Sequence, residues 1–274
     1  MKKVEIENLE VELLIDAIFK RYGYDFRHYS RASFKRRINN FLSKTSFNKP
    51  TEIIPQLLYD RTLLESLIYN LSVPVTEMFR DPFVYKAIRG KVVDILKTYS
   101  FVKIWHAGCA TGEEVYSMAI LLKEEDLYDR AQIYATDFNN EALEKSKKGI
   151  YPVESIKGYT ANYQKSGGKE SFSKYYHSKY DSVIVNQDLK KNIVFANHNL
   201  STDSVFGEIH FIMCRNVLIY FDQTLQNRVL KLFYDSLINK GILCLGTKET
   251  TQFSDFQEHF ITINKKARIY QKRT

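Results

Sequence analysis

The chain has 274 residues, of which 44% are hydrophobic and 26% are charged, and its formal net charge is +8. That length and composition are typical of a globular protein with one large or two modest domains and an ample core. The N-terminus lacks the apolar segment of a signal peptide, and no stretch approaches the roughly 20 apolar residues that a membrane-spanning helix needs. Three scattered cysteines favour reduced thiols over a disulfide framework or a metal site: Cys109, Cys214 and Cys244. We therefore expect a cytoplasmic protein that inserts into no membrane.

Residues 1–72 are expected to form a helical N-terminal domain. Apolar side chains keep one face of a first helix, which should stop at Gly23. Ser30 can cap a second helix, with its apolar residues inside and its basic residues outside. Pro55 should keep a third helix short, and a fourth is expected over residues 62–71.

Positive charge gathers in residues 20–50, where nine Lys or Arg stand against one acid, Asp25. The cluster predicts a negatively charged partner, and both nucleic acid and an acidic protein surface qualify. A solvated helix face without a partner explains the same charge equally well.

Residues 73–274 read as an α/β domain, in which expected strands and helices alternate. Asp81 followed by Pro82 is a strong helix start, with an N-cap residue and proline at the first helical position. Strands are expected at FVKIWHA, AQIYATD, EIHFIMC and GILCLGT, and helices over 113–124, 139–147 and 223–238. This alternation is typical of a doubly wound, mostly parallel sheet.

One segment, residues 150–192 approximately, does not follow the alternation. It is polar and rich in tyrosine, and it ends in two runs of alternating apolar residues. A turn at residues 186–188 between these runs predicts a hairpin, and the whole segment is expected to be a small β insertion.

The stretch HAGCATGEEVYSMAI, residues 106–120, joins an expected strand to an expected helix through a glycine turn. Gly108 and Gly112 are four residues apart, which matches neither the dinucleotide fingerprint nor the P-loop. Glu113 and Glu114 follow directly and would repel a phosphate. The pair Thr111 and Glu114 also fits a capping box, which would need no ligand.

The next strand favours a ligand. Asp137 ends that strand, where an acidic residue of a doubly wound fold grips the two hydroxyls of a ribose. A ribose acid without a phosphate loop suits a nucleoside without phosphates. S-adenosylmethionine is such a nucleoside, and its ammonium and sulfonium charges suit the carboxylates near the glycine turn. The residues alone therefore predict a methyltransferase.

Five ordered stretches together resemble the chemotaxis receptor methyltransferase (CheR) family. They are VPVTEMFRDP, WHAGCATGEEVYSMAI, IYATDFNNEALEKSKKGIY, ANHNL and FIMCRNVLIYFD. The resemblance covers residues 65–250 approximately and implies a Rossmann-like methyltransferase domain with a β insertion after an all-α domain. It also implies S-adenosyl-L-methionine as cofactor, S-adenosyl-L-homocysteine as product, and glutamates in the cytoplasmic domains of chemoreceptors as substrate.

The resemblance also assigns roles to individual residues. Thr76 and Arg80 should lie against the cofactor, with Arg80 near the substrate as well. Glu114 should hold the methionine amino group, and Asp137 should hold the ribose. Tyr220 should face the reacting carboxylate. The remaining cofactor residues should flank the adenine (Asn199 and Leu200) or line the cofactor pocket (Arg215 and Asn216).

A glutamate carboxylate is ionised at neutral pH and needs no general base, so Arg80 and Tyr220 are expected to position the substrate without transferring a proton. The chain departs from the family pattern at Pro74, where the family often has asparagine, and at Met78 and Val115. Two alternatives stay open: a methyltransferase acting on nucleic acid, and a cofactor-binding scaffold without catalysis. We expect a monomer that does not bind nucleic acid.

Overall fold

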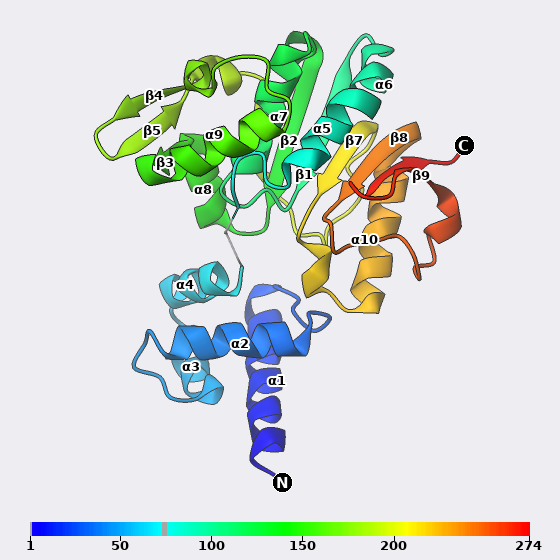
Figure 1. Cartoon of the computed structure of the whole chain (residues 1–274). Helices are drawn as coiled ribbons and strands as arrows, with labels where there is room; N and C mark the ends of the chain where they lie inside the picture. The colour runs from blue at the N-terminus through cyan, green and yellow to red at the C-terminus, as the bar shows by residue number, and fades with distance from the viewer. Residues whose placement is uncertain (1, 73–75) are drawn as a thin grey trace. The chain divides into compact units, whose positions relative to one another are not determined.

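The computed structural model of the chain describes residues 2–72 and 76–274, which form two compact units (Figure 1). The first unit contains residues 2–72 together with Tyr220–Arg228. The second contains residues 76–219 and 229–274. A short stretch from the C-terminal half of the chain thus belongs, by its contacts, to the N-terminal unit. Pro74 lies outside the described residues.

The first unit is helical, as expected. It contains α1 (Lys3–Tyr22), α2 (Arg31–Leu42), α3 (Pro50–Leu57) and α4 (Arg61–Leu71). α1 ends at Gly23, whose φ of 81° is the left-handed conformation that glycine favours. Helix α3 packs on α1, and α4 packs on α2. The buried side chains of α1 are those of the expected apolar face: Val11, Leu14, Ile15 and Ile18.

Two expectations for α2 are wrong. Ser30 stands at the N-cap, but its side chain makes no capping hydrogen bond. Arg37 is buried with Phe34, Ile38 and Phe41, although the basic residues were expected outside. Helical periodicity assigns residues to faces by their polarity, and it gives no signal for an arginine that packs inward.

The second unit is built on a seven-stranded sheet in the order β6-β2-β1-β7-β8-β10-β9. Strands β6, β2, β1, β7 and β8 are parallel, whereas β10 is antiparallel to both of its neighbours. This confirms the doubly wound, mostly parallel sheet. The strand bounds are β1 (Val102–Ala107), β2 (Ala131–Asp137), β6 (Ile193–Asn197), β7 (Ile209–Cys214), β8 (Leu237–Leu245), β9 (Phe260–Asn264) and β10 (Ile269–Lys272).

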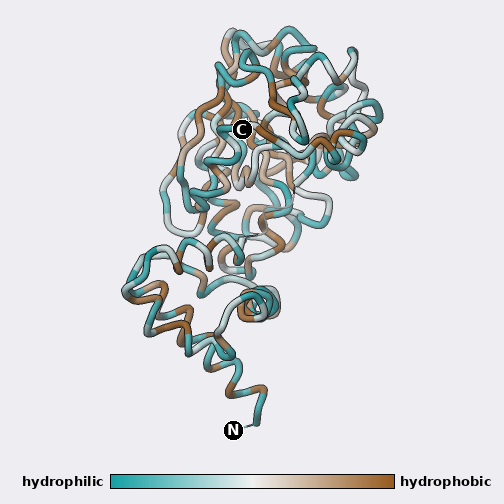
Figure 2. Tube along the Cα trace, turned by 90° about the vertical axis from the view of Figure 1, so that its left-hand side faces the viewer, coloured by the Kyte–Doolittle hydropathy of each residue, from teal (hydrophilic) through white to brown (hydrophobic). Residues whose placement is uncertain are grey.

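The helices that accompany the sheet are α5 (Pro82–Lys91), α6 (Val93–Lys97), α7 (Glu113–Glu124), α8 (Asn140–Lys148) and the part of α10 (Gln223–Ser236) that follows Arg228. Helices α7 and α8 lie against β2. The strands read as nearly continuous apolar runs because helices cover the sheet. Figure 2 shows that hydrophobic stretches recur along the chain. Trp105, in β1, is fully buried. The three cysteines of the chain are also buried, and all three have free thiols.

The insertion forms its own three-stranded antiparallel sheet, β3 (Ile150–Pro152), β5 (Ser182–Val185) and β4 (Tyr176–Lys179), with helix α9 (Ile156–Lys165) beside it. The predicted hairpin turn at residues 186–188 is wrong. That segment leads out of the insertion to β6, which pairs with β2 in the main sheet. The real hairpin joins β4 to β5. Alternating apolar residues identify a strand, but they do not name its partner.

A buried carboxylate ties the insertion to α7. The Glu124 side chain accepts hydrogen bonds from the hydroxyls of Tyr163 and Tyr175, the latter at 2.8 Å, and pairs with Arg89 of α5. Aromatic side chains of the insertion belong to the same hydrophobic cluster as β1 and α7. The insertion is therefore part of the core of this unit. None of the helices in the described ranges is both long and apolar enough to cross a membrane.

Candidate functional site

The glycine turn lies between β1 and α7, and close packing explains both of its glycines. A Cβ on Gly108 would lie 2.5 Å from a methyl group of Val217, and one on Gly112 would lie 2.1 Å from the hydroxyl of Ser146. Both glycines have positive φ. The backbone N–H of Gly108 donates to the carbonyl of Thr136 at 2.8 Å, which holds the turn against the end of β2.

The first glutamate of the motif, Glu113, lies in surroundings that favour its neutral form more than water does. Burial raises the pKa of Glu113 to about 7, although the hydroxyl of Thr111, 2.7 Å away, opposes that rise. Tyr159, from the insertion, lies 3.4 Å from the same carboxylate. The expected capping box is absent from this turn, because α7 starts after Gly112 and Thr111 bonds to Glu113 instead of capping the helix with Glu114.

The second glutamate belongs to a buried cluster of charges. Its carboxylate lies 3.1 Å from Nδ1 of His106 and 3.1 Å from Nη1 of Arg215. Arg215, whose side chain is 1% exposed, also pairs with Asp81 at 2.6 Å. Burial would raise the pKa of Glu114, but the bond to His106 and the charge of Arg215 outweigh it and hold that pKa below its ordinary value. Their surroundings thus favour the ionised form of Glu114 and raise the pKa of Glu113.

The cluster carries more negative than positive charge. Two carboxylates, from Glu114 and Asp81, face the single guanidinium of Arg215. Partly buried carboxylates that outnumber their cation favour a cationic ligand nearby. Two buried nitrogens here, Nε of Arg215 and Nε2 of His106, have no hydrogen-bond partner among residues 2–72 and 76–274.

Asp137 lies at the end of β2, beside the glycine turn. One carboxylate oxygen accepts the N–H of Ala110 at 2.9 Å, and the other accepts the N–H of Asn139 at 2.9 Å. Burial raises the pKa of Asp137, and these backbone hydrogen bonds oppose the rise. Each carboxylate oxygen has a second lone pair that could accept from a hydroxyl. The end of β6 joins the same place, since the N–H of His198 donates to the carbonyl of Asp137.

Asn199 and Leu200 follow β6. The side chain of Asn199 accepts the N–H and the hydroxyl of Ser201 at 3.0 and 2.7 Å, so it shapes its own loop. Leu200 is buried. The structure therefore brings the ends of β1, β2 and β6 together.

The loop after β7 carries Arg215 and Asn216, and it depends on a residue that the sequence did not single out. The buried carboxylate of Glu249 accepts the N–H groups of Asn216 at 3.1 Å, Ile219 at 3.3 Å and Gly246 at 2.5 Å. Asn216 has a φ of 62°. Glu249 lies within the polar stretch GTKETTQ, and its only sequence signal is its place after a buried strand.

The backbone on either side of Arg80 is strained. Phe79 and Asp81 have φ values of 54°, which are uncommon for residues with a side chain and most unusual for an aromatic. The N–H of Phe79 donates to the hydroxyl of Ser117 at 2.8 Å, and the carbonyl of Arg80 accepts from Arg215. Asp81 starts α5 as predicted, but its carboxylate bonds to Arg215 and neither caps the helix nor pairs with Arg80.

Tyr220 belongs to the helical unit. The N–H of Ser30 donates to the carbonyl of Tyr220 at 2.7 Å, and the ring of Phe221 packs edge-on against Tyr29 at 5.0 Å. The guanidinium carbon of Arg37 lies 4.2 Å from the centroid of the Tyr220 ring. Its position in the sequence had suggested that Tyr220 belongs with the α/β domain. Hydrophobic periodicity does not reveal that this segment packs on the N-terminal helices.

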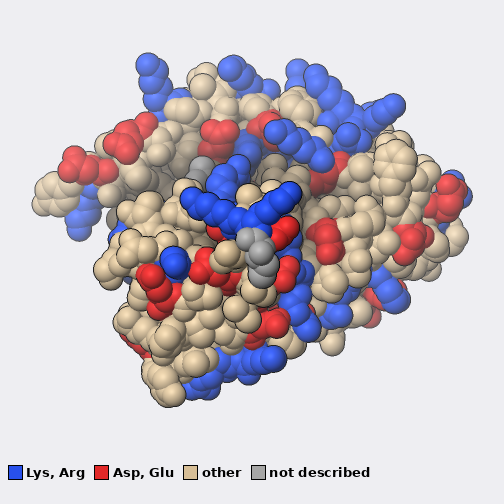
Figure 3. Space-filling view, turned by 90° about the horizontal axis from the view of Figure 1, so that it is seen from below, with Lys and Arg blue, Asp and Glu red and all other residues tan. Residues whose placement is uncertain are grey.

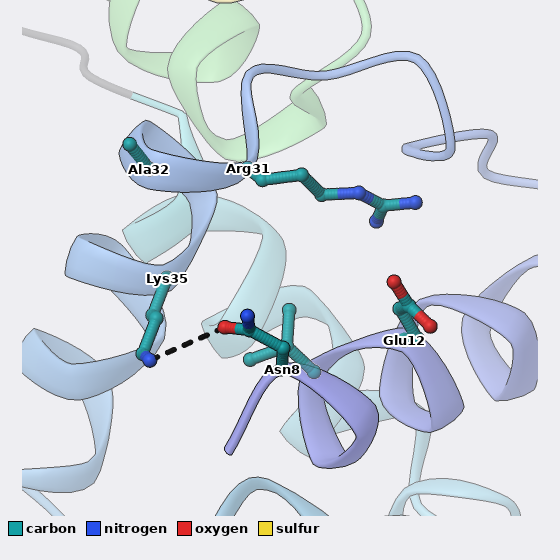
Figure 4. A pocket seen from close by; sticks show the side chains of 6 residues that line it. Asn8, Glu12, Arg31, Ala32 and Lys35 are labelled. Atoms are coloured by element: carbon teal, nitrogen blue, oxygen red, sulfur yellow. Dashed lines mark hydrogen bonds between the residues drawn. The ribbon is translucent and has the colours of Figure 1, made fainter. Parts of the chain in front are cut away.

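The basic helix α2 is less uniformly positive than its sequence. Lys35 pairs with Glu7 of α1 at 2.7 Å and contacts Asn8, whereas Arg36 is exposed and Arg37 is buried. Arg31 and Glu12 point toward each other across a pocket between α1 and α2 (Figure 4). Acidic and basic side chains are interspersed on the face drawn in Figure 3. Part of the charge run is therefore neutralised within the unit.

Two family models match the chain. The CheR methyltransferase all-alpha domain matches residues 9–72, and the CheR methyltransferase SAM binding domain matches residues 74–269. A Pseudomonas putida protein, Cher3, is 46% identical over 97% of this chain and 97% of its own length. A chemotaxis protein methyltransferase of Listeria innocua is 29% identical over 89% of this chain and 92% of its own. One of Escherichia coli is 31% identical over 72% and 67%.

Proposed function

Because this chain belongs to the CheR family of S-adenosylmethionine-dependent chemotaxis methyltransferases, we propose that it esterifies glutamate side chains in the cytoplasmic domains of chemoreceptors. The observation that carries the proposal is the cluster of Glu114 and Asp81 around the buried Arg215, in which two carboxylates face one guanidinium. A site of that charge suits a cofactor with a cationic amino acid end, and the absence of a phosphate loop in the sequence suits a nucleoside without phosphates.

The residues fit the cofactor in their chemistry. Glu114 would hold the methionine ammonium, Asp137 the ribose hydroxyls, and Asn199 and Leu200 the adenine. When bound, S-adenosylmethionine supplies an electrophilic methyl group and leaves as S-adenosylhomocysteine. Besides lining the cofactor pocket, Arg215 would help to keep Glu114 ionised, because its positive charge lowers the pKa of that carboxyl group. Thr76 and Asn216 stay candidates for contact with the cofactor.

The chain's own contribution to the chemistry is to position the substrate. A glutamate carboxylate is ionised at neutral pH, so no residue has to remove a proton from it. Arg80 and Tyr220 would each offer hydrogen-bond donors to that carboxylate, and neither would transfer a proton. Orientation and exclusion of water can supply much of the rate enhancement of such a reaction. A strong ion pair with Arg80 would make the carboxylate a weaker nucleophile. The neutral hydroxyl of Tyr220 is therefore the better hydrogen-bond donor to the attacking oxygen.

Methyl transfer from radiolabelled S-adenosylmethionine to chemoreceptor-containing membranes tests this function. Label that is released by mild base identifies a carboxyl methyl ester. Tyr220→Phe and Arg80→Ala should each lower turnover about 10- to 100-fold in a folded protein. Label in RNA or DNA would point to a nucleic-acid methyltransferase, and cofactor binding without any transfer would point to a scaffold; either result would overturn the proposal.

A further inference from the structure

The segment that carries Tyr220 is fixed to the helical unit along its backbone. Besides the bond from Ser30 to Tyr220, the N–H of Asp222 donates to the carbonyl of His28 at 2.9 Å. Tyr29 and Phe221 form an isolated antiparallel bridge between these two bonds. A short ladder centred on Phe221 therefore fixes the backbone carbonyl of Tyr220. The orientation of its side chain is a separate question, because a half-buried tyrosine can adopt more than one rotamer.

One side chain of α2 packs on the face of that ring. Arg37 is 7% exposed, and its guanidinium carbon lies 4.2 Å from the ring centroid of Tyr220. Nη1 donates to the carbonyl of Leu71 at the end of α4, but Nε and Nη2 have no hydrogen-bond partner within the part of the chain that the structure describes. A buried guanidinium that leaves two nitrogens unpaired is costly, so its position calls for a compensating contact.

The ring of Tyr220 supplies that contact. A guanidinium over the face of an aromatic ring is attracted by the ring quadrupole, and the attraction strengthens when both groups are desolvated. The planar guanidinium also restricts the ring it covers, which a lysine ammonium would not do in the same way. An acidic partner protein has little access to the guanidinium of Arg37, because this side chain is buried. Its neighbour Arg36 is exposed and available to an acidic partner.

We propose that Arg37 is a positioning residue for Tyr220: it orients the tyrosine side chain that receives the substrate carboxylate, and it does not itself dock the receptor. This inference rests on the proposed function, since it assigns Tyr220 to the substrate. It divides two adjacent arginines of one helix between different tasks. Arg36 contributes to attraction of an acidic substrate protein, whereas Arg37 acts on the methyl-transfer step through Tyr220.

Steady-state kinetics of Arg37→Gln and Arg36→Gln separate the two tasks. We expect Arg37→Gln to lower kcat about tenfold or more, with the KM for receptor membranes and the affinity for S-adenosylmethionine within about twofold of the wild type. Arg36→Gln should instead raise the receptor KM and leave kcat unchanged. In a Tyr220→Phe background, Arg37→Gln should cost less than about twofold further, because the hydroxyl it orients is gone.

A higher receptor KM for Arg37→Gln, like that of Arg36→Gln, would overturn the proposal, and so would a full loss in the Tyr220→Phe background. If Arg37→Gln fails to fold by circular dichroism, Arg37→Lys keeps the charge without the planar stack and should show the same drop in kcat.

A second readout does not depend on turnover. In protein labelled with 3-fluorotyrosine, the ¹⁹F resonance that disappears in Tyr220→Phe belongs to Tyr220. Arg37→Gln and Arg37→Lys should shift or broaden that resonance, and Arg36→Gln should not. An unchanged resonance in both Arg37 variants would refute the contact. If the wild type methylates no receptor but the resonance shifts, the proposed function fails while the packing of Arg37 on Tyr220 stands.

Discussion

Two runs of like charge stand in this sequence, Lys35-Arg36-Arg37 on α2 and Glu113-Glu114 on α7, and the structure breaks up both. On α2, one residue is paired, one is exposed and one is buried. On α7, Glu113 has a raised pKa, whereas Glu114 is kept ionised by His106 and Arg215. Adjacent residues of a helix point about 100° apart, so neighbours of equal charge meet different surroundings. The charge of a run in sequence is thus a poor measure of the charge that a partner meets.

The largest effect is expected for the ion pairs of Glu114 and Asp81 with Arg215. Arg215→Met should destabilise the protein by about 3–5 kcal/mol, because it leaves the carboxylates of Glu114 and Asp81 without their cation. Urea unfolding measures the loss. Arg61→Met serves as the control, since Arg61 pairs with Glu65 on the surface of α4 and its loss should be small. Equal losses of unfolding free energy would mean that the ion pairs of Arg215 stabilise the protein no more than an exposed pair does.

The two glutamates of α7 can be compared directly. Glu114→Gln should weaken the affinity for S-adenosylmethionine about 10- to 100-fold, or roughly 1.4–2.8 kcal/mol, because it removes the excess negative charge of the cluster. Calorimetric titration measures the change. Glu113→Gln should alter the affinity by less than a few-fold, since burial already favours its neutral form. The same loss in both variants would contradict the division between them.

Glu249 extends the comparison to a carboxylate that is held by backbone N–H groups and not by a cation. Glu249→Gln should cost about 1–3 kcal/mol of stability, because an amide nitrogen would face donors that need an acceptor. The loop of Arg215 and Asn216 should loosen, so cofactor affinity should fall as well. The exposed Glu258→Gln is the matched control. Unchanged cofactor affinity would show that the loop does not need Glu249.

Glu113 also predicts a dependence of stability on pH. Its pKa in the folded protein is about 7 and its ordinary value is 4.5, so the folded state binds more protons between these values. The free energy of unfolding should therefore fall as pH rises from about 5 to 7, by up to about 1.4 kcal/mol per pH unit from this residue. Glu113→Gln should lack this contribution, whereas Glu154→Gln on the surface should keep it. Parallel profiles for wild type and Glu113→Gln would refute the assignment.

The smallest effect is expected at Lys35. Because its ammonium pairs with Glu7, Lys35→Gln should leave the KM for receptor membranes nearly unchanged. Arg36→Gln should raise that KM severalfold, and the increase should shrink at high salt. Methylation assays at two ionic strengths compare the variants. A larger effect for Lys35 than for Arg36 would return the whole basic run to the role of an undivided docking surface.

Sequence reasoning succeeded where one local rule decides the outcome. The apolar face of α1, the span of α7 and the parallel strands followed from periodicity and from the turn residues around them. It failed where distant segments decide. The partners of β5 and β6, the inward turn of Arg37 and the three backbone bonds of Glu249 all depend on residues far away in the chain. The site residues named by the resemblance remain predictions, although the ends of β1, β2 and β6 do meet at Asp137.

The return of Tyr220–Arg228 to the helical unit has a consequence for how the protein is made. A ribosome that has finished residue 72 has produced α1 to α4 but not the segment that bonds to His28 and Ser30. Completion of the first unit must therefore await most of the second. A fragment that ends at residue 72 should be less stable than the same helices in the full chain, and supplying residues 220–228 as a peptide should restore part of the difference.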